Sequence, residues 1–228
     1  MATIIGNAQT MSQVKTVVKD LRSDFDVPTG EVMSWKKHLK THERRLHAAK
    51  SLARIEDLLV VYALTRKADL YEGSFQNSQK DFYDFVAACA YKATLWAARS
   101  MEATDVRIRF GRVRGVDHAR TLRYIEQTTQ SDPKVPTHLQ RELSWVGADQ
   151  HFESEAADFY AGFMKTAFWP DAFGNVDDVY LKHVWGQIRK NPQGCAIPLG
   201  LFTMPSYQVA FEQDWFSCVD CPAQLKEK

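Results

Sequence analysis

Apolar residues recur along the chain either at helical spacing or in the patterns of strands. Stretches with helical spacing alternate with stretches that resemble strands. Helical spacing predicts amphipathic helices over 12–25 and 78–101, whereas the unbroken apolar run 58–64 predicts a buried strand. Residues 106–110 alternate strictly, which indicates a strand with one apolar and one basic face. The other expected elements are strands at Thr3–Ile5 and Leu143–Val146, a helix opening at Thr41, and helices over His118–Thr129, Glu153–Phe168 and Val176–Lys190.

Strands that alternate with helices predict an α/β protein with a mixed sheet flanked by helices. The chain has 228 residues, 45% of them hydrophobic and 25% charged, which is typical of a globular protein. We expect one domain over residues 1–192 and an irregular C-terminal extension over 193–228, where several prolines interrupt an apolar mixture. A chain of this size buries roughly 70–75% of its extended surface, so it needs no disulfide or metal to fold.

The sequence predicts a soluble, cytoplasmic protein that does not enter a membrane. No stretch reaches the ~18 uninterrupted apolar residues of a membrane span. Residues 1–10 lack the basic region and long apolar stretch of a secretory signal. The 4 cysteines are too few for a disulfide scaffold in a chain this long.

Several common chemical motifs are missing from the sequence. It has no glycine-rich phosphate loop and no Gly-x-Ser-x-Gly elbow, so no motif points to a small-molecule enzyme. Cys218 and Cys221 have the spacing of half a zinc site, but no second close pair completes four ligands, and we expect no zinc.

The net charge of +1 hides an uneven distribution of charge. Residues 31–54 contain seven Lys/Arg and two acidic residues, and residues 107–123 contain six arginines and one aspartate. Residues 147–180 reverse the balance, with seven acidic residues and one lysine. Such segregation produces local fields.

The two basic stretches are candidates for nucleic-acid binding, because phosphate neutralisation needs several Lys/Arg on one surface and a neighbouring aromatic ring can stack on a base. The alternative is a solvated face, or an edge strand whose charge discourages aggregation. The candidate residues are Trp35, Lys36, Lys37, His38, Lys40, Arg44, Arg45, Arg107, Arg109, Arg112 and Arg114.

Two carboxylates stand three residues apart in the acidic helix, Glu155 and Asp158, and therefore share a helix face. Small residues around them predict close packing, where a carboxylate must be paired or bound to a metal. Mg²⁺ or Mn²⁺ accepts such oxygen ligands. The alternative is an acidic first turn favoured by the helix dipole, which explains Glu155 better than Asp158.

An ordered set of segments over roughly residues 1–190 resembles the domain-of-unknown-function 3800 family, which is common in bacteria and phages and considered ribonuclease-H-like. The most specific piece is Ala-Asp-Phe-Tyr-Ala-Gly at 157–162, followed by Phe173-Gly174 and Tyr180-Leu181. The other pieces are Thr3-Ile4-Ile5-Gly6, Trp35-Lys36-Lys37-His38, Val60 to Lys67, Asp81-Phe82-Tyr83 and Val106 to Gly115.

The resemblance implies a phosphodiester-processing site. Ribonuclease-H-like enzymes hold two divalent ions on acidic side chains, one ion activating water and the other stabilising the leaving oxygen. Asp158 falls at the family's C-terminal-helix carboxylate, Lys67 at its strand-end lysine, and His38 in its Trp/His-Lys segment. The expected catalytic residues are therefore Asp158, Glu155 and Lys67, with Asp158 and Glu155 as ligands of Mg²⁺ or Mn²⁺.

The family usually begins with a strand that carries Tyr-Ile-Asp-Glu-Ser-Gly or a close variant, whose Asp is the first metal ligand. The chain has no such segment. Residues 106–110 also carry arginines where a second carboxylate is expected. Either the chain is a truncated or degenerate member, or another chain completes its sheet, so a protein partner or a homo-oligomer through an exposed sheet edge is expected. We expect a non-catalytic protein that binds nucleic acid or a partner protein in phage–host conflict, and the alternative is an active metal-dependent nuclease.

Overall fold

The computed structural model describes residues 1–66, 69–70, 78–147, 149–171 and 173–216. Contacts divide the chain into two compact units. The first, here called the α6 unit, contains residues 2–60 and 146–188. The second, here called the α4 unit, contains residue 1 and residues 61–145 and 189–228. The expected division into a domain over residues 1–192 and a C-terminal extension over 193–228 stays a prediction.

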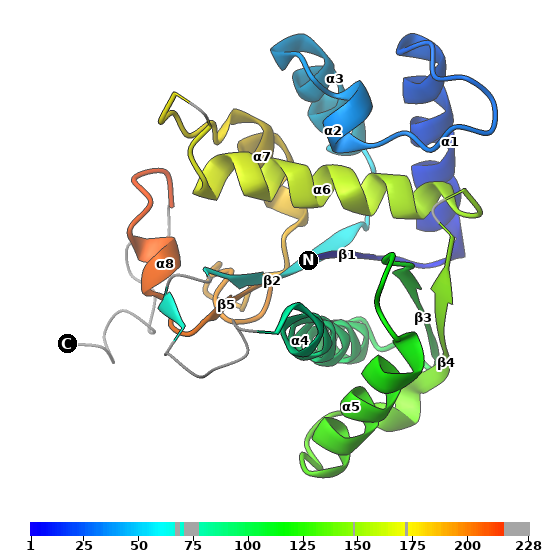
Figure 1. Ribbon diagram of the computed structural model, residues 1–228, viewed down its shortest axis with the longest axis vertical. Coiled ribbons are helices and arrows are strands. Elements are labelled where there is room, and N and C mark those ends of the chain that lie inside the picture. The colour runs from blue at the N-terminus through cyan, green and yellow to red at the C-terminus, as the bar shows by residue number, and fades with distance from the viewer. Residues whose placement is uncertain (67–68, 71–77, 148, 172, 217–228) are drawn as a thin grey trace. The chain divides into compact units, whose positions relative to one another are not determined.

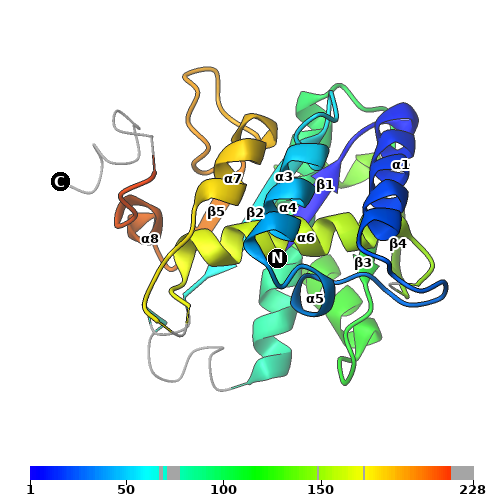
Figure 2. The ribbon, with the colours of Figure 1, turned by 90° about the horizontal axis from the view of Figure 1, so that it is seen from above.

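The α6 unit is built around the helix that carries the acidic residues. Its elements are β1 (Ala2–Ile5), α1 (Ala8–Asp24), α2 (Trp35–His38), α3 (His42–Leu52), α6 (Phe152–Phe168), α7 (Val179–Val184) and the 3-10 helix η4 (Trp185–Gln187). Helix α6 packs against α1, β1 and α7, and it runs crosswise to α1 (Figure 1). Helix α3 lies between α1 and α7 (Figure 2).

Local capping and periodicity explain the helices of this unit. The side chain of Asn7 accepts a hydrogen bond from the Thr10 N–H at 2.9 Å and so opens α1. Val14, Val18 and Leu21 form the buried stripe of α1, as the spacing predicts. Thr41 opens α3, because its hydroxyl accepts from a backbone N–H in the first turn.

The α4 unit contains two pairs of strands and a long helix. Its elements are β2 (Leu59–Thr65, from Val61 on), α4 (Gln79–Ser100), β3 (Val106–Gly111), α5 (His118–Gln130), η3 (Thr137–Leu139), β4 (Gln140–Val146, up to Trp145), β5 (Leu201–Met204) and α8 (Gln208–Phe211). Strands β2 and β5 are parallel, with Tyr62 opposite Leu201 and Thr65 opposite Met204. Strands β3 and β4 form a two-stranded sheet, and α4 packs against α5.

The structure corrects the expected last helix, Val176–Lys190. Helix α7 ends at Val184, and the chain then turns through η4 into an extended Ile188 that bridges Val60. The side-chain amide of Gln187 donates to the carbonyls of Leu52 and Ile55 at 2.9 and 3.0 Å. These long-range contacts override the helical spacing of the apolar residues.

The C-terminal region also contains a strand that periodicity does not reveal. Strand β5 is four residues long, which is too short for an alternating pattern to distinguish a strand from other structures. Its pairing with β2 makes it part of the sheet. The other expected strands and helices are present within a few residues of their predicted bounds, so the chain is a mixed α/β protein with helices packed around its strands. None of the described helices has the length and apolar character needed to cross a membrane.

Candidate functional site

Glu155 is a buried carboxylate that holds the loop before α2. Its side chain is 3% exposed. Oε1 accepts hydrogen bonds from Arg22 Nη1 at 2.8 Å and from the Met33 backbone N–H at 3.0 Å. Burial raises the pKa of Glu155, against the opposite effect of the Met33 N–H and of Arg22. The same Arg22 guanidinium donates to the carbonyls of Pro28 and Glu31 at 3.0 and 2.7 Å, so one ion pair fixes the whole loop onto α6.

Asp158 is exposed, which corrects the expectation of a buried carboxylate. Its Oδ2 accepts a hydrogen bond at 2.8 Å from the backbone N–H of Trp35, the first residue of α2. A carboxylate is favourable there because the first N–H groups of a helix have no partner within the helix. Glu155 and Asp158 do share a helix face, since both bind the segment Met33–Trp35.

Trp35 is buried with 6% of its surface exposed, so it is not placed to stack on a base. Its ring meets Phe163 edge-on at 5.4 Å between centroids. Its indole also covers Gly162, where a Cβ would overlap the ring. The guanidinium of Arg45 lies over the ring, 4.6 Å from its centroid. Trp35 therefore works as a packing residue between α2 and α6.

Three other members of the first basic stretch also have structural partners. His38 is buried; its Nδ1 accepts from the Ser34 N–H at 3.2 Å, so Nε2 carries the proton and donates to Glu31 Oε1 at 3.0 Å. Arg44 and Arg45 donate to the carbonyls of His38 and Leu39 at 3.2 and 2.8 Å. These carbonyls end α2, where cationic groups are favourable.

Among the candidate residues of this stretch, the exposed basic groups are the lysines. Lys36, Lys37 and Lys40 are exposed, and Lys37 forms an ion pair with Glu31. This pairing lowers the pKa of Glu31, first through the Lys37 hydrogen bond. Of the candidate residues in the first basic stretch, these three lysines alone are exposed. The other expected catalytic cation, Lys67, lies outside the described residues.

The second basic stretch is arranged as the alternation predicts. In β3 Arg107 and Arg109 are exposed, whereas Ile108 and Phe110 are buried. Arg112 and Arg114 are exposed in the loop that follows. Within the described part of the chain, none of these four guanidinium groups forms an ion pair. We call Arg107, Arg109, Arg112 and Arg114 the arginine strip.

Aromatic rings pack beside the residues of the arginine strip. The ring of Trp145 stacks on Phe110 and on His118, with centroids 5.5 and 5.4 Å apart. Arg112 Nε donates to the Trp145 carbonyl at 3.3 Å. Burial, and then the charge of Arg112, lower the pKa of His118, which disfavours a positive charge on this imidazole.

A neighbouring arginine, Arg120, belongs to a different arrangement. It pairs with Asp81 and, through Nε at 3.0 Å, with the buried carboxylate of Asp84. Thr121 donates its hydroxyl to the same carboxylate at 2.5 Å. These contacts hold α5 on α4, so the guanidinium of Arg120 is not free to bind a ligand.

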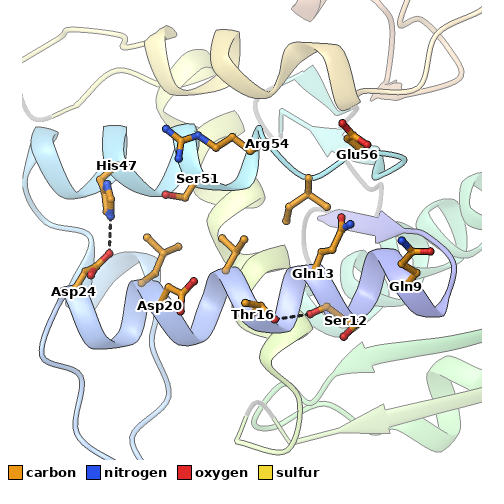
Figure 3. Close-up of a pocket in the computed structure, with 13 residues that line it drawn as sticks. Gln9, Ser12, Gln13, Thr16, Asp20, Asp24, His47, Ser51, Arg54 and Glu56 are labelled. Carbon is orange, nitrogen blue, oxygen red and sulfur yellow. Dashed lines mark hydrogen bonds and ion pairs between the residues drawn. The ribbon is translucent and has the colours of Figure 1, made fainter.

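A groove of about 560 Å³ lies between α1 and the α3 region (Figure 3). Its charged side chains are three carboxylates, Asp20, Asp24 and Glu56, together with His47 and Arg54. The imidazole of His47 contacts the Asp24 carboxylate at 2.8 Å. Because acidic groups predominate, the groove does not extend the basic surface and does not suit a polyanion.

The predicted Mg²⁺ or Mn²⁺ site receives no support from the geometry at its expected ligands. Oε1 of Glu155 accepts from two N–H donors, one of them a guanidinium that repels a dication, whereas the buried Oε2 has no hydrogen-bond partner among the described residues. Among the described residues, no group of three or more His, Cys, Asp or Glu side chains is arranged to hold a metal ion. Metal binding by Glu155 and Asp158 stays a prediction.

Comparisons with known proteins assign no relative: no family model, no curated protein and no solved structure matches the chain. The candidate site therefore rests on its own residues. Sequence reasoning missed Arg22 and Glu31, which organise the loop before α2. No local pattern joins Arg22 to Glu155, which lies 133 positions away in the chain.

Proposed function

We propose that the chain is a non-catalytic, ribonuclease-H-like protein that binds nucleic acid through the arginine strip, in the setting of phage–host conflict. The observation that carries the proposal is the exposure of four guanidinium groups that no acidic side chain neutralises within the described residues. The fold and the setting rest on the resemblance described above and on the alternation of strands and helices.

The strip has the chemistry that a phosphate backbone requires. Guanidinium groups bind phosphate oxygens in a bidentate geometry and stay charged at every physiological pH. Arg107 and Arg109 are two residues apart on one strand, so their Cα atoms lie about 6.7 Å from each other along it. Arg112 and Arg114 are exposed in the loop that follows the strand, and the proposal assigns further phosphate contacts to them.

The absence of catalysis is proposed from the way in which the acidic residues are used. Glu155 is committed to Arg22 and Met33, and Asp158 binds the Trp35 N–H. These contacts explain both carboxylates as structural residues. The alternative, a Mg²⁺- or Mn²⁺-dependent nuclease, would have to bind the ion through the oxygens that these contacts leave open, such as Oε2 of Glu155.

Binding is tested by fluorescence anisotropy with labelled single- and double-stranded DNA and RNA, at salt concentrations from about 50 to 200 mM. A variant with serine at all four strip positions should lose most of its affinity. The slope of log K against log salt should fall by ~0.7–0.9 for each phosphate contact removed.

The matched control replaces the three exposed lysines of the α6 unit, Lys36, Lys37 and Lys40, by serine. This variant loses a similar amount of charge and should bind nearly as the unmodified chain does. Equal losses in the two variants would show an effect of net charge and would refute a specific role of the strip. An unmodified chain that binds no nucleic acid would refute the proposal.

The catalytic alternative is tested in the same assay with Mn²⁺ added. Cleavage that disappears in Asp158→Ala, while this variant keeps its fold by circular dichroism, would establish the nuclease and overturn the non-catalytic reading. We expect binding without cleavage.

A further inference from the structure

Strands β3 and β4 of the α4 unit pair in a two-stranded sheet that turns one face to the core (Figure 1). Ile108 and Phe110 of β3 belong to the same hydrophobic cluster as Leu143 and Trp145 of β4. Because side chains on a strand alternate between its two faces, the residues between these positions lie on the opposite face. We call this opposite face the outer face of the β3–β4 sheet.

The outer face carries polar side chains of different hydrogen-bonding types. Arg107 and Arg109 of β3 are exposed, and within the described residues neither forms an ion pair. In β4 Glu142 is exposed and Ser144 is half-buried. The Ser144 hydroxyl donates to Oε1 of Glu142 at 3.2 Å, so these two side chains share a face. The outer face therefore presents guanidinium donors on β3 and a carboxylate acceptor on β4.

The carboxylate of Glu142 does not suit a surface that binds phosphates alone. Phosphate groups repel a carboxylate, so Glu142 should weaken binding that depends only on the phosphate backbone. A carboxylate instead accepts a hydrogen bond from the amino group of cytosine, and arginine donates to the two acceptors of guanine. Both base edges are accessible in the major groove of duplex DNA. The combination of side chains on the outer face thus matches base edges better than it matches phosphates.

The dimensions of the sheet also fit the major groove. This groove is about 12 Å wide and admits a two-stranded ribbon. Paired strands lie about 4.8 Å apart, and the β3–β4 sheet has no third strand among the described residues. Arg107 and Arg109 are about 6.7 Å apart along β3, which is close to two base-pair steps of about 3.4 Å each. The two arginines can therefore reach base pairs that are two steps apart.

We propose that the outer face of the β3–β4 sheet enters the major groove of duplex DNA and recognises its sequence. Arg107 and Arg109 donate to guanine edges, and Glu142 accepts from a cytosine amino group. Arg112 and Arg114, in the loop after β3, bind phosphates and fix the position of the sheet. The proposal rests on the nucleic-acid binding proposed above and names its ligand class. Double-stranded RNA should bind less well, because side chains cannot reach the bases in its deep, narrow major groove.

Selection from a library of duplex DNA with a randomised centre tests the proposal. The unmodified chain should enrich a sequence that contains guanine–cytosine pairs, and it should bind the enriched duplex more tightly than a scrambled duplex of the same composition. Glu142→Ala should bind the enriched duplex about 5- to 150-fold more weakly, which is the loss expected for one base contact. The same variant should bind the scrambled duplex at least as tightly as the unmodified chain does, because a carboxylate that repels phosphates has been removed.

Arg114→Ser is the matched control, because it removes one exposed charged side chain that is assigned to a phosphate. It should weaken the binding of the enriched and the scrambled duplex by the same factor and reduce the dependence on salt. Circular dichroism confirms that both variants fold.

Three results would overturn the inference while leaving the proposed nucleic-acid binding in place. In the first, Glu142→Ala changes the affinity for both duplexes by the same factor, so the carboxylate contacts no base. In the second, selection enriches no sequence. In the third, single strands or RNA bind as tightly as the enriched duplex. A chain that binds no nucleic acid of any kind would refute the proposed function and this inference together.

Discussion

The carboxylate of Asp158 accepts a hydrogen bond from the backbone N–H of Trp35 at 2.8 Å, and this bond joins the acidic helix α6 to the first turn of α2. The acidic helix and the first basic stretch, which the sequence indicates as candidates for nucleic-acid chemistry, are thus hydrogen-bonded to each other. The Glu155–Arg22 ion pair adds a second connection to the same segment. This arrangement gives the acidic helix a structural role that can be tested directly.

Removal of the Asp158 carboxylate should destabilise the chain moderately. Asp158→Ala leaves the Trp35 N–H without its acceptor, and loss of such a helix-capping bond costs about 1 kcal/mol. Asp158→Asn keeps an acceptor oxygen and should lose less. Urea unfolding followed by tryptophan fluorescence measures both variants. Equal stability of Asp158→Ala and the unmodified chain would show that the hydrogen bond contributes nothing.

The stability of the chain should depend on pH through Glu155. Because burial raises its pKa above the usual 4.5, the folded state holds the proton more tightly than the unfolded state does. The stabilisation from Glu155 is therefore complete below pH 4.5 and is lost as pH rises through the folded-state pKa. Relative to Glu155→Gln, the unmodified chain should lose stability as pH rises above 4.5, which unfolding curves at several pH values measure. If the unmodified chain instead gains stability relative to Glu155→Gln as pH rises, the attraction by Arg22 affects the pKa of Glu155 more than burial does.

Gly162→Ala should destabilise the α6 unit although alanine favours helices. An alanine Cβ at this position would overlap the indole of Trp35, and overpacking of this kind typically costs about 1–3 kcal/mol. Gly186→Ala is the matched control, because no atom lies within 4 Å of its added Cβ. Thermal unfolding of the two variants compares them. If Gly162→Ala is as stable as the control, Trp35 does not pack on α6 as described.

The sequence by itself determined the local elements and which side chains share a face. The alternation at 106–110 predicts that Arg107 and Arg109 face solvent while Ile108 faces the core, because side chains on a strand alternate and burial follows polarity. The spacing of Glu155 and Asp158 likewise predicts their common face.

Only the tertiary structure decided what those faces meet. Burial of Trp35 and exposure of Asp158 depend on where α2 packs on α6, and the partner of Glu155 comes from α1, far away in the chain. Strand β5 likewise exists because it pairs with β2. Periodicity predicts which side of a helix or strand is apolar. It does not predict which distant element covers that side, because packing and long-range hydrogen bonds form only when the chain folds.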